Sequence, residues 1–219
     1  MWSWETVWEV TPLILKGLIV TLQAVAGGMT LAVVLGLLWA VARRSEWKLL
    51  SWIVWGGVEF VRSTPLLVQL FFVYFIMADL LGGGFSPLLV GIVVLGIHYS
   101  CYTAEVYRAG LDAVPNGQWQ AAKALNLSPA QTYRYVILPQ AVPPILPNLG
   151  NYLIAMLKDA PLLSTITVLE MLNQAQIFGK ERFRFLEPLT IVGLIFILLS
   201  LIFGLAVAWL RKRTAVSPT

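Results

Sequence analysis

Long stretches without a charged residue constrain this chain more than any other feature of its sequence. These runs are almost entirely apolar and cover residues 17–42, 80–104, 135–157 and 188–210, with a shorter one at 63–78. A helix of about 20 residues crosses the ~30 Å hydrocarbon core of a bilayer. We therefore expect one all-α membrane domain over residues 1–219, with five transmembrane helices at about 13–42, 49–80, 86–110, 143–172 and 187–211.

The overall composition argues against a soluble helical bundle. Hydrophobic residues make up 58% of the 219 residues and charged residues only 12%, whereas soluble domains average roughly 45–50% and 25%. A soluble bundle also needs a polar face along each helix, and these runs are apolar on every side. Cys101, the single cysteine, lies inside a predicted span, so we interpret it as a small buried apolar residue.

The distribution of Lys and Arg predicts the orientation of the chain. If the carboxyl end is inside, nine basic residues lie near the inner surface and three near the outer one. The inner set is Arg43, Arg44, Lys48, Arg108, Lys123, Arg134, Arg211, Lys212 and Arg213, and the outer set is Lys180, Arg182 and Arg184. Cytoplasmic loops retain positive charge, so we expect the amino terminus outside and the carboxyl terminus in the cytoplasm. The net charge of +4 then reflects this inner bias, and no nucleic-acid partner is expected.

The first residues predict an anchor at the membrane surface. Residues 2–9, "WSWETVWE", place Trp beside acidic residues, which suits an amphipathic segment at the outer interface before Pro12. No basic residues precede an apolar stretch here, so a cleavable leader is not expected and the first span stays in the protein.

Two charged pairs lie near the predicted inner ends of spans. Glu59 and Arg62, and again Glu105 and Arg108, are three residues apart, a spacing at which helical side chains can form an ion pair. A structural pair is the favoured interpretation for Glu59 and Arg62, with a ligand role for Arg62 kept open. Pro65 then breaks the second span, because proline disrupts a helix.

The longest patterned loop is cytoplasmic and covers residues 114–141. Asn116 can cap a short helix on which Trp119, Ala122 and Leu125 share a face. Asn126 stands where a left-handed residue usually ends a helix. A loop of this length and pattern predicts a docking site for a partner.

A second helix is predicted directly after this turn. Ser128, Pro129 and Gln131 supply a cap, a first-turn proline and the third residue of a capping box. Pro139 is expected to stop or kink that helix.

The segment "GQWQAAKALNLSPAQTYRYVILPQA" resembles the EAA loop of the permease subunits of binding-protein-dependent ABC importers. The similarity is greatest to the polar amino acid family and continues through "GLIVTLQ", "EFVRSTPLLVQLFFVYF", "AEVYRAGLDAVPNGQW" and "LKDAPLLSTI". Two positions depart from the usual motif, Gln120 in place of Glu and Asn126 in place of Gly. Asn is the next best residue after Gly for a left-handed turn, so we expect the backbone to be preserved, whereas an ionic contact at Gln120 is in doubt.

The resemblance implies a type I, MetI-like importer permease with cytoplasmic coupling helices, located in the bacterial inner membrane. Its implied partners are two cytoplasmic ATPase subunits, a second permease subunit and an extracytoplasmic substrate-binding protein. The chain has no G-x-x-x-x-G-K-[ST] loop, so we expect no enzymatic activity and no cofactor in it, with ATP and Mg bound by the ATPase. The implied ATPase contacts are Gly117, Gln120, Ala121, Ala122, Leu125 and Asn126.

Lys158, Asp159 and Pro161 interrupt the fourth predicted span. Charged residues inside a bilayer cost ~2.5–3.5 kcal/mol each, so we expect Lys158 and Asp159 to line the translocation path. Pro161 frees carbonyl groups of the preceding turn, as in the broken helices of transporters. Asp159 is expected to attract an α-ammonium group, Lys158 an α-carboxylate, and Ser164 to add a hydroxyl contact. The alternative is that Lys158 and Asp159 neutralise each other or residues of a second subunit.

Two other classes of protein, a secondary transporter and an intramembrane enzyme, are alternatives. Arg62 precedes Pro65 by the same three positions by which Lys158 precedes Pro161, and paired broken spans also suit a secondary transporter with inverted repeats. An intramembrane enzyme needs a nucleophile with a base or a metal cluster, and the only histidine, His98, favours a packed core residue.

The sequence limits the substrate only to a class. A polar amino acid is the first expectation, and an ectoine-like zwitterion is the alternative because Tyr99 and Tyr102 can offer aromatic faces to a delocalised cation. Arg62, His98 and Tyr102 are therefore counted with the residues of the path. The sequence leaves open whether the second permease subunit is an identical chain or a sister chain.

Overall fold

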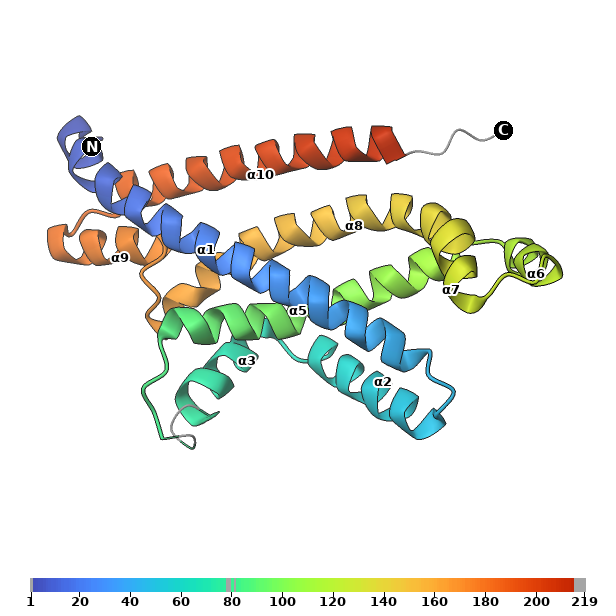
Figure 1. Cartoon of the computed structure of the whole chain (residues 1–219). Coiled ribbons are helices and arrows are strands. Elements are labelled where there is room, and N and C mark those ends of the chain that lie inside the picture. Colours follow the sequence, from blue (N-terminus) through green and yellow to red (C-terminus); the bar gives the residue numbers. More distant parts are fainter. Residues whose placement is uncertain (1, 78–79, 81, 215–219) are drawn as a thin grey trace.

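The computed structural model describes residues 2–77, 80 and 82–214, which form a bundle of long helices (Figure 1). The helices in chain order are α1 (Trp4–Arg43), α2 (Lys48–Arg62), α3 (Leu66–Phe71), α5 (Pro87–Asp112), α6 (Asn116–Ala124), α7 (Pro129–Gln131), α8 (Leu138–Asp159), α9 (Met171–Arg182) and α10 (Leu186–Thr214). Two π-helical turns, η1 (Phe72–Met77) and η2 (Thr132–Ile137), follow α3 and α7, and a 3-10 segment, η3 (Ala160–Ile166), follows α8.

Three of the described helices, α1, α5 and α10, are long and apolar enough to cross a membrane alone. Two further candidate spans are bent. The second span turns by 101° between α2 and α3, and the fourth turns by 45° between its long part, Pro129–Ile166, and α9. Counting each bent pair as one gives up to five spans, in agreement with the expected all-α membrane fold.

The first helix differs from the expected one at its amino end. It begins at Trp4 rather than near Leu13, because the Ser3 hydroxyl caps it by accepting a bond from the Thr6 amide at 3.3 Å. The helix passes through Pro12 without ending, so the Trp-rich segment belongs to the same helix as the first span.

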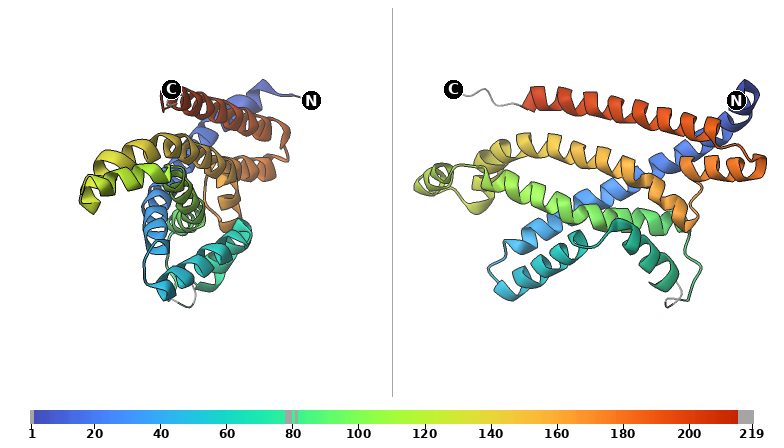
Figure 2. Two further views of the ribbon diagram at one scale, coloured as in Figure 1. Left: turned by 90° about the vertical axis from the view of Figure 1, so that its right-hand side faces the viewer. Right: turned by 180° about the vertical axis from the view of Figure 1, so that it is seen from behind.

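The core lies where α1 crosses α5 and α8, which Figure 2 shows from two further sides. Residues from α1, α3, α5, α8 and η3 form one hydrophobic cluster there, with Leu70, Leu95, Met156 and Leu163 fully buried. The cluster extends to both breaks, since Leu66 follows the first, at Pro65, and Ala160 directly precedes Pro161 at the second. Packing within this hydrophobic cluster holds the two bent spans in place.

The helix α9 was not expected from the sequence. Residues 143–172 were read as one span, but the α-helix ends at Asp159 and a left-handed residue, Thr167, turns the chain before α9 begins. Glu170 caps α9 by accepting bonds from the backbone amides of Leu172 and Asn173. The start of α9 packs so closely on α1 that a Cβ at Gly17 would lie 2.8 Å from the Glu170 and Met171 backbone.

A chain of ion pairs ties together the carboxyl-terminal ends of α1 and α5. Glu105 pairs with Arg43 and, at 2.8 Å, with Arg108. Asp112 then pairs with Arg108 and with Arg44, each at 2.8 Å. The predicted pair of Glu105 and Arg108 is therefore confirmed as part of a larger network.

Before α5, three consecutive glycines have positive φ, Gly82, Gly83 and Gly84. The expected end of the second span near residue 80 adjoins residues 78–79 and 81, which lie outside the described part of the chain.

Candidate functional site

The first break in the chain is stabilised by a side chain that the sequence analysis did not single out. The Gln69 amide nitrogen donates to the carbonyl oxygens of Val61 at 2.8 Å and Thr64 at 3.2 Å, and to the Thr64 hydroxyl at 2.7 Å. These carbonyls flank the break at Pro65, where an α-helix leaves carbonyl groups without partners. Gln69 therefore replaces backbone bonds that the 101° turn removes.

Gln69 also links this break to α5. Its carbonyl oxygen lies 3.1 Å from Nδ1 of His98, which is only 8% exposed. This hydrogen bond confirms that His98 is a bonded residue of the core. His98 can still lie on the predicted path, because its ring also contacts the rings of Tyr99 and Tyr102.

Four aromatic rings form a cluster in the middle of the bundle. His98, Tyr99 and Tyr102 come from α5, and Tyr152 comes from α8. The His98 ring centroid lies 5.4 Å from that of Tyr99 and 5.3 Å from that of Tyr102, and Tyr152 lies 5.6 Å from Tyr102. We call these four residues the aromatic cluster. Tyr152 was not predicted, although it precedes Asp159 by seven residues and so lies on the same face of α8.

Asp159 contacts the aromatic cluster at Tyr99. The Tyr99 hydroxyl donates to Oδ2 of Asp159 at 2.6 Å, a short bond of the kind that charged acceptors make. Tyr99 itself is 4% exposed, so the bond fixes the carboxylate from within the core. Sequence reasoning found Asp159 from its charge but had no means of finding its donor.

Lys158 lies apart from this arrangement. It is exposed, whereas Asp159 is half-buried, and within the described residues the two side chains form no ion pair. Mutual neutralisation inside one chain is therefore not observed. A role for Lys158 toward a carboxylate or toward a second subunit stays a prediction.

The second break follows directly after Asp159. Pro161 occupies the first turn of η3, so the α-helix passes into a tighter 3-10 helix at the expected place. The Ser164 hydroxyl donates to the Pro161 carbonyl oxygen at 2.7 Å and so stabilises this turn. A contact between Ser164 and a ligand stays a prediction.

The segments that follow the two breaks contact each other through a pair that was not predicted. The hydroxyl groups of Tyr74, in η1, and Thr167 lie 3.2 Å apart. Thr167 has a φ of 65°, which is unusual for a β-branched residue, so the turn is held by its surroundings. The segments that follow the breaks of the second and fourth spans are thus in direct contact.

Arg62 contacts the aromatic cluster at Tyr102. Its Nη1 donates to Glu59 Oε1 at 3.0 Å, which confirms the predicted pair. Its guanidinium carbon lies 5.4 Å from the centre of the Tyr102 ring, within the range of a cation–π contact. A cation and an anion therefore contact two neighbouring rings of the same cluster.

The candidate coupling surface is the loop formed by α6 and α7. Ala122 is 2% exposed and, with Trp119, faces this chain, where the Trp119 ring packs edge-on against Tyr133 at 5.4 Å. Leu125 is 73% exposed, so it does not share a face with Trp119 and Ala122 as expected. The reason is that Leu125 follows the last helical residue and turns away from the helix.

The capping pattern of this loop is confirmed at three residues and wrong at one. Asn126 has a φ of 52°, as expected for a left-handed terminating residue. Ser128 and Gln131 form the predicted capping box. Asn116, however, is the first helical residue, and Pro115 holds the cap position without a side-chain bond.

The exposed face of the loop is available for a partner. Gly117, Gln120, Ala121, Leu125 and Asn126 are exposed, which leaves Ala122 as the one predicted ATPase contact that is enclosed within its own chain. Pro139 does not stop the helix, because a π-helical turn, η2, directly precedes it and carries the chain from α7 into α8. The loop is thereby connected by continuous helix to Tyr152 and Asp159.

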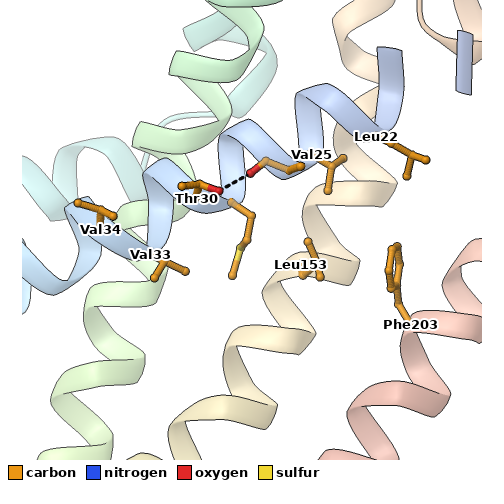
Figure 3. A pocket seen from close by; sticks show the side chains of 9 residues that line it. Leu22, Val25, Thr30, Val33, Val34, Leu153 and Phe203 are labelled. Carbon is orange, nitrogen blue, oxygen red and sulfur yellow. Dashed lines mark hydrogen bonds between the residues drawn. The ribbon is translucent and has the colours of Figure 1, made fainter. Parts of the chain in front are cut away.

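A large groove elsewhere on the chain offers little polar chemistry. Its volume is about 560 Å³, and α1, α8 and α10 line it with side chains such as Val25, Leu153 and Phe203 (Figure 3). The Thr30 hydroxyl on its wall already donates to the Ala26 carbonyl oxygen at 2.8 Å. A zwitterion would find no charged partner there, so the aromatic cluster is the better candidate site.

Comparison with known proteins gives consistent matches. The family model described as "Binding-protein-dependent transport system inner membrane component" matches residues 32–216. A probable amino-acid ABC transporter permease protein of Sinorhizobium fredii is 47% identical over 194 residues, which is 89% of this chain and 84% of that protein. The glutamine transport system permease protein of Escherichia coli is 31% identical over 215 residues, 98% of each chain.

Two solved structures share the fold. One, a crystal structure of an amino acid ABC transporter with histidines, has a TM-score of 0.91 and 35% identity, covering 97% of this chain and 99% of that one. An inward-facing MetNI methionine ABC transporter has a TM-score of 0.74 at 19% identity, covering 98% and 100%, and it supports the fold alone.

Proposed function

Because the chain belongs to the family of binding-protein-dependent transport system inner membrane components and is the permease subunit of an amino acid ABC importer, we propose that it carries a polar amino acid past the aromatic cluster. It is a multi-pass protein of the inner membrane, and its family works with an ATPase and a substrate-binding protein. These relatives do not favour the alternative function, a secondary transporter.

The proposed assembly contains two copies of the ATPase and a second permease subunit. ATP and Mg are bound and hydrolysed in the ATPase, and the loop formed by α6 and α7 receives the resulting movement. The amino terminus lies outside and the carboxyl terminus in the cytoplasm. Support for this orientation comes from the excess of Lys and Arg on one side.

The single observation that carries the proposed path is the short bond between Tyr99 and Asp159 in the middle of a broken span. A carboxylate at this depth is costly unless it faces a partner or a water-filled cavity. Tyr99 supplies one hydrogen bond, and a carboxylate can accept more. The remaining capacity of Asp159 suits the ammonium group of an amino acid.

The chemistry around Asp159 supports a small zwitterion as the substrate. The aromatic rings provide faces for a cation, and Asp159 provides its counter-charge. A Bacillus subtilis relative, 33% identical over 87% of this chain, is named as an arginine transport system permease protein, and the Escherichia coli relative as a glutamine one, so these two amino acids are the first candidates. An ectoine-like solute is the alternative that the same rings allow.

Uptake into proteoliposomes tests the proposal. The permease is reconstituted with its ATPase and receptor, and labelled arginine, glutamine, glutamate, histidine and ectoine are supplied separately. We expect import of at least one amino acid that requires both ATP and the receptor. Import driven by an ion gradient without the ATPase, or import of ectoine alone, would contradict the proposal.

A further inference from the structure

Two pockets adjoin each other between α8 and α10, near the carboxyl-terminal end of α10. One has a volume of about 480 Å³ and the other about 320 Å³, and Arg211 lines both of them. The α8 wall runs from Gln140 to Ile154, and the α10 wall includes Gly204, Val207 and Ala208. Lining residues recur at every third or fourth position, so each wall is one face of its helix. We call the two pockets together the α8–α10 groove; the two helices run side by side in Figure 1.

One end of the α8–α10 groove lies within the hydrocarbon layer. Its walls there are Ile154, Val207 and Ala208, with one amide side chain, Asn151. The α10 residues belong to the uncharged run 188–210, which is apolar enough to cross the membrane. An apolar wall at this depth suits a hydrocarbon chain of a lipid, whereas a small water-soluble anion gains nothing from it.

The other end of the groove is cationic. Arg211 and Lys212 directly follow the uncharged run, both side chains are exposed, and neither forms an ion pair within the described part of the chain. No described Asp or Glu residue lines either pocket. Trp209 stands two residues before Arg211 and is 55% exposed, which is typical of the belt where a span meets the headgroups. An anion at headgroup level therefore finds two cations here and no competing carboxylate.

Two amide side chains add hydrogen-bond donors at the cationic end. Nε2 of Gln140 donates to the Val136 carbonyl oxygen at 2.6 Å, and Nδ2 of Asn148 donates to the Pro144 carbonyl oxygen at 2.9 Å. Each amide group has two N–H donors, so one remains on each side chain. Both residues line the same pocket as Arg211, and their remaining donors suit the oxygens of a phosphate group.

We propose that the α8–α10 groove binds an anionic phospholipid. Its phosphate contacts Arg211 and Lys212, and one acyl chain follows Ile154 and Val207. Basic pockets between transmembrane helices bind anionic headgroups through this combination of charge and apolar wall. In the proposed orientation the site faces the cytoplasmic leaflet. The site is separate from the aromatic cluster, and the inference does not depend on which substrate the permease carries.

Native mass spectrometry of the permease–ATPase complex, titrated with defined lipids in detergent, tests this site. The probes are phosphatidylglycerol, phosphatidylcholine with the same acyl chains, and inorganic phosphate. The wild-type complex should bind phosphatidylglycerol more tightly than phosphatidylcholine, and inorganic phosphate should not displace it. Arg211→Gln should lower the affinity for phosphatidylglycerol about fivefold, and Arg211→Gln with Lys212→Gln about 25-fold, since each cation near an anionic headgroup contributes a similar amount.

Arg213→Gln is the matched control for charge. It removes one positive charge from the same end of α10, but Arg213 does not line the groove, and its guanidinium carbon lies 4.5 Å from the centre of the Trp209 ring. The affinity for phosphatidylglycerol should stay nearly unchanged in this variant. An equal loss in Arg213→Gln and Arg211→Gln would indicate attraction to the general surface charge and would overturn the inference.

Gly204→Leu tests the apolar part of the groove. A Cβ at Gly204 has no atom within 4 Å, so a larger side chain fills the groove without disturbing the helix packing. Gly193→Leu is the control, because Gly193 is equally open, lies on the same helix and does not line the groove. We expect loss of tight phosphatidylglycerol binding in Gly204→Leu alone, among complexes that remain assembled.

Two further results would contradict a lipid site. The first is displacement of phosphatidylglycerol by inorganic phosphate together with normal binding in Gly204→Leu, which would indicate a site for a free anion. The second is equal affinity of the wild-type complex for phosphatidylglycerol and phosphatidylcholine. Neither result bears on amino acid import, so the proposed function stands or falls by its own experiment.

Discussion

At the scale of single residues, the proposed path depends on how Asp159 is oriented. The Tyr99 hydroxyl fixes one carboxylate oxygen at 2.6 Å, and Tyr99 is itself held by the rings of His98 and Tyr152. A carboxylate held in this way loses little conformational freedom when a ligand arrives, which favours binding.

Tyr99→Phe is expected to weaken transport without preventing assembly. The change removes one hydrogen bond, worth ~1 kcal/mol, and keeps the ring, so half-saturation of uptake should shift to a concentration about fivefold higher. Tyr107→Phe is the matched control, because Tyr107 lies on the same helix but donates to the Val33 carbonyl oxygen at 3.2 Å. An unchanged half-saturation in Tyr99→Phe, or an equal shift in the control, would argue against an orienting role.

Residue types in the sequence indicated part of this site. Charge, aromatic character and neighbouring prolines can be read directly from the sequence. They placed four residues on the expected path: Arg62, His98, Tyr102 and Asp159. Gln69 and Tyr152 were missed because their roles come from contacts between elements far apart in the chain. No local pattern marks a glutamine that replaces backbone bonds at a break.

At the scale of elements, close approach of α1 and α5 holds the bundle together. A Cβ at Gly36 would overlap the Thr103 hydroxyl and lie 2.9 Å from the Ser100 carbonyl oxygen. The Thr103 hydroxyl in turn donates to the Ala32 carbonyl oxygen of α1 at 2.7 Å. A small residue at position 36 is therefore required for this contact.

Gly36→Ala is expected to lower the stability of the permease by ~1–3 kcal/mol, the usual cost of overpacking. Thermal unfolding in detergent, followed by Trp fluorescence, measures the change. Gly56→Ala is the control, because no atom lies within 4 Å of its added Cβ. There the better helix propensity of alanine should leave stability unchanged or raise it by up to ~1 kcal/mol. A stable Gly36→Ala protein would show that α1 and α5 can separate.

The breaks were predictable as elements, but their shapes were not. Pro65 and Pro161 indicated where the α-helices end, since proline lacks an amide hydrogen. The 101° turn at the first break and the separate helix α9 after the second depend on tertiary packing. Pro139 does not stop its helix for the same reason, because the chain adopts a π-helical turn before it and continues into α8.

At the scale of the whole molecule, continuous helix connects the coupling loop to the site. The chain passes from α7 through η2 into α8, and α8 ends at Asp159 (Figure 1). A movement of the loop can therefore be transmitted along a rigid element to the aromatic cluster. The overall fold of the chain was predictable from the sequence, because its long apolar runs and its loop motif are local patterns.

Ala121→Glu is expected to release the ATPase and leave the membrane domain folded. Ala121 is exposed, so a charge there disturbs only a partner, whereas Ala122 is enclosed and a charge there would disturb the loop itself. Co-purification of the tagged permease with its ATPase measures the effect, and Ala121→Ser serves as the control. Full retention of the ATPase by a folded Ala121→Glu permease would remove this surface from the proposed interface.

The most direct test of the account is ATP-driven uptake by a complex that carries Asp159→Asn. This change keeps the size of the side chain and removes its charge. An ammonium–carboxylate bond is worth ~1.5–3 kcal/mol, so affinity at the permease should fall by about 10- to 150-fold while the receptor binds as before. Asp112→Asn is the control, because Asp112 pairs with Arg44 and Arg108 at the carboxyl-terminal end of α5. Uptake is measured below half-saturation in complexes of equal stability: loss in Asp159→Asn alone is the expected result, and normal uptake by that variant would contradict the assigned path.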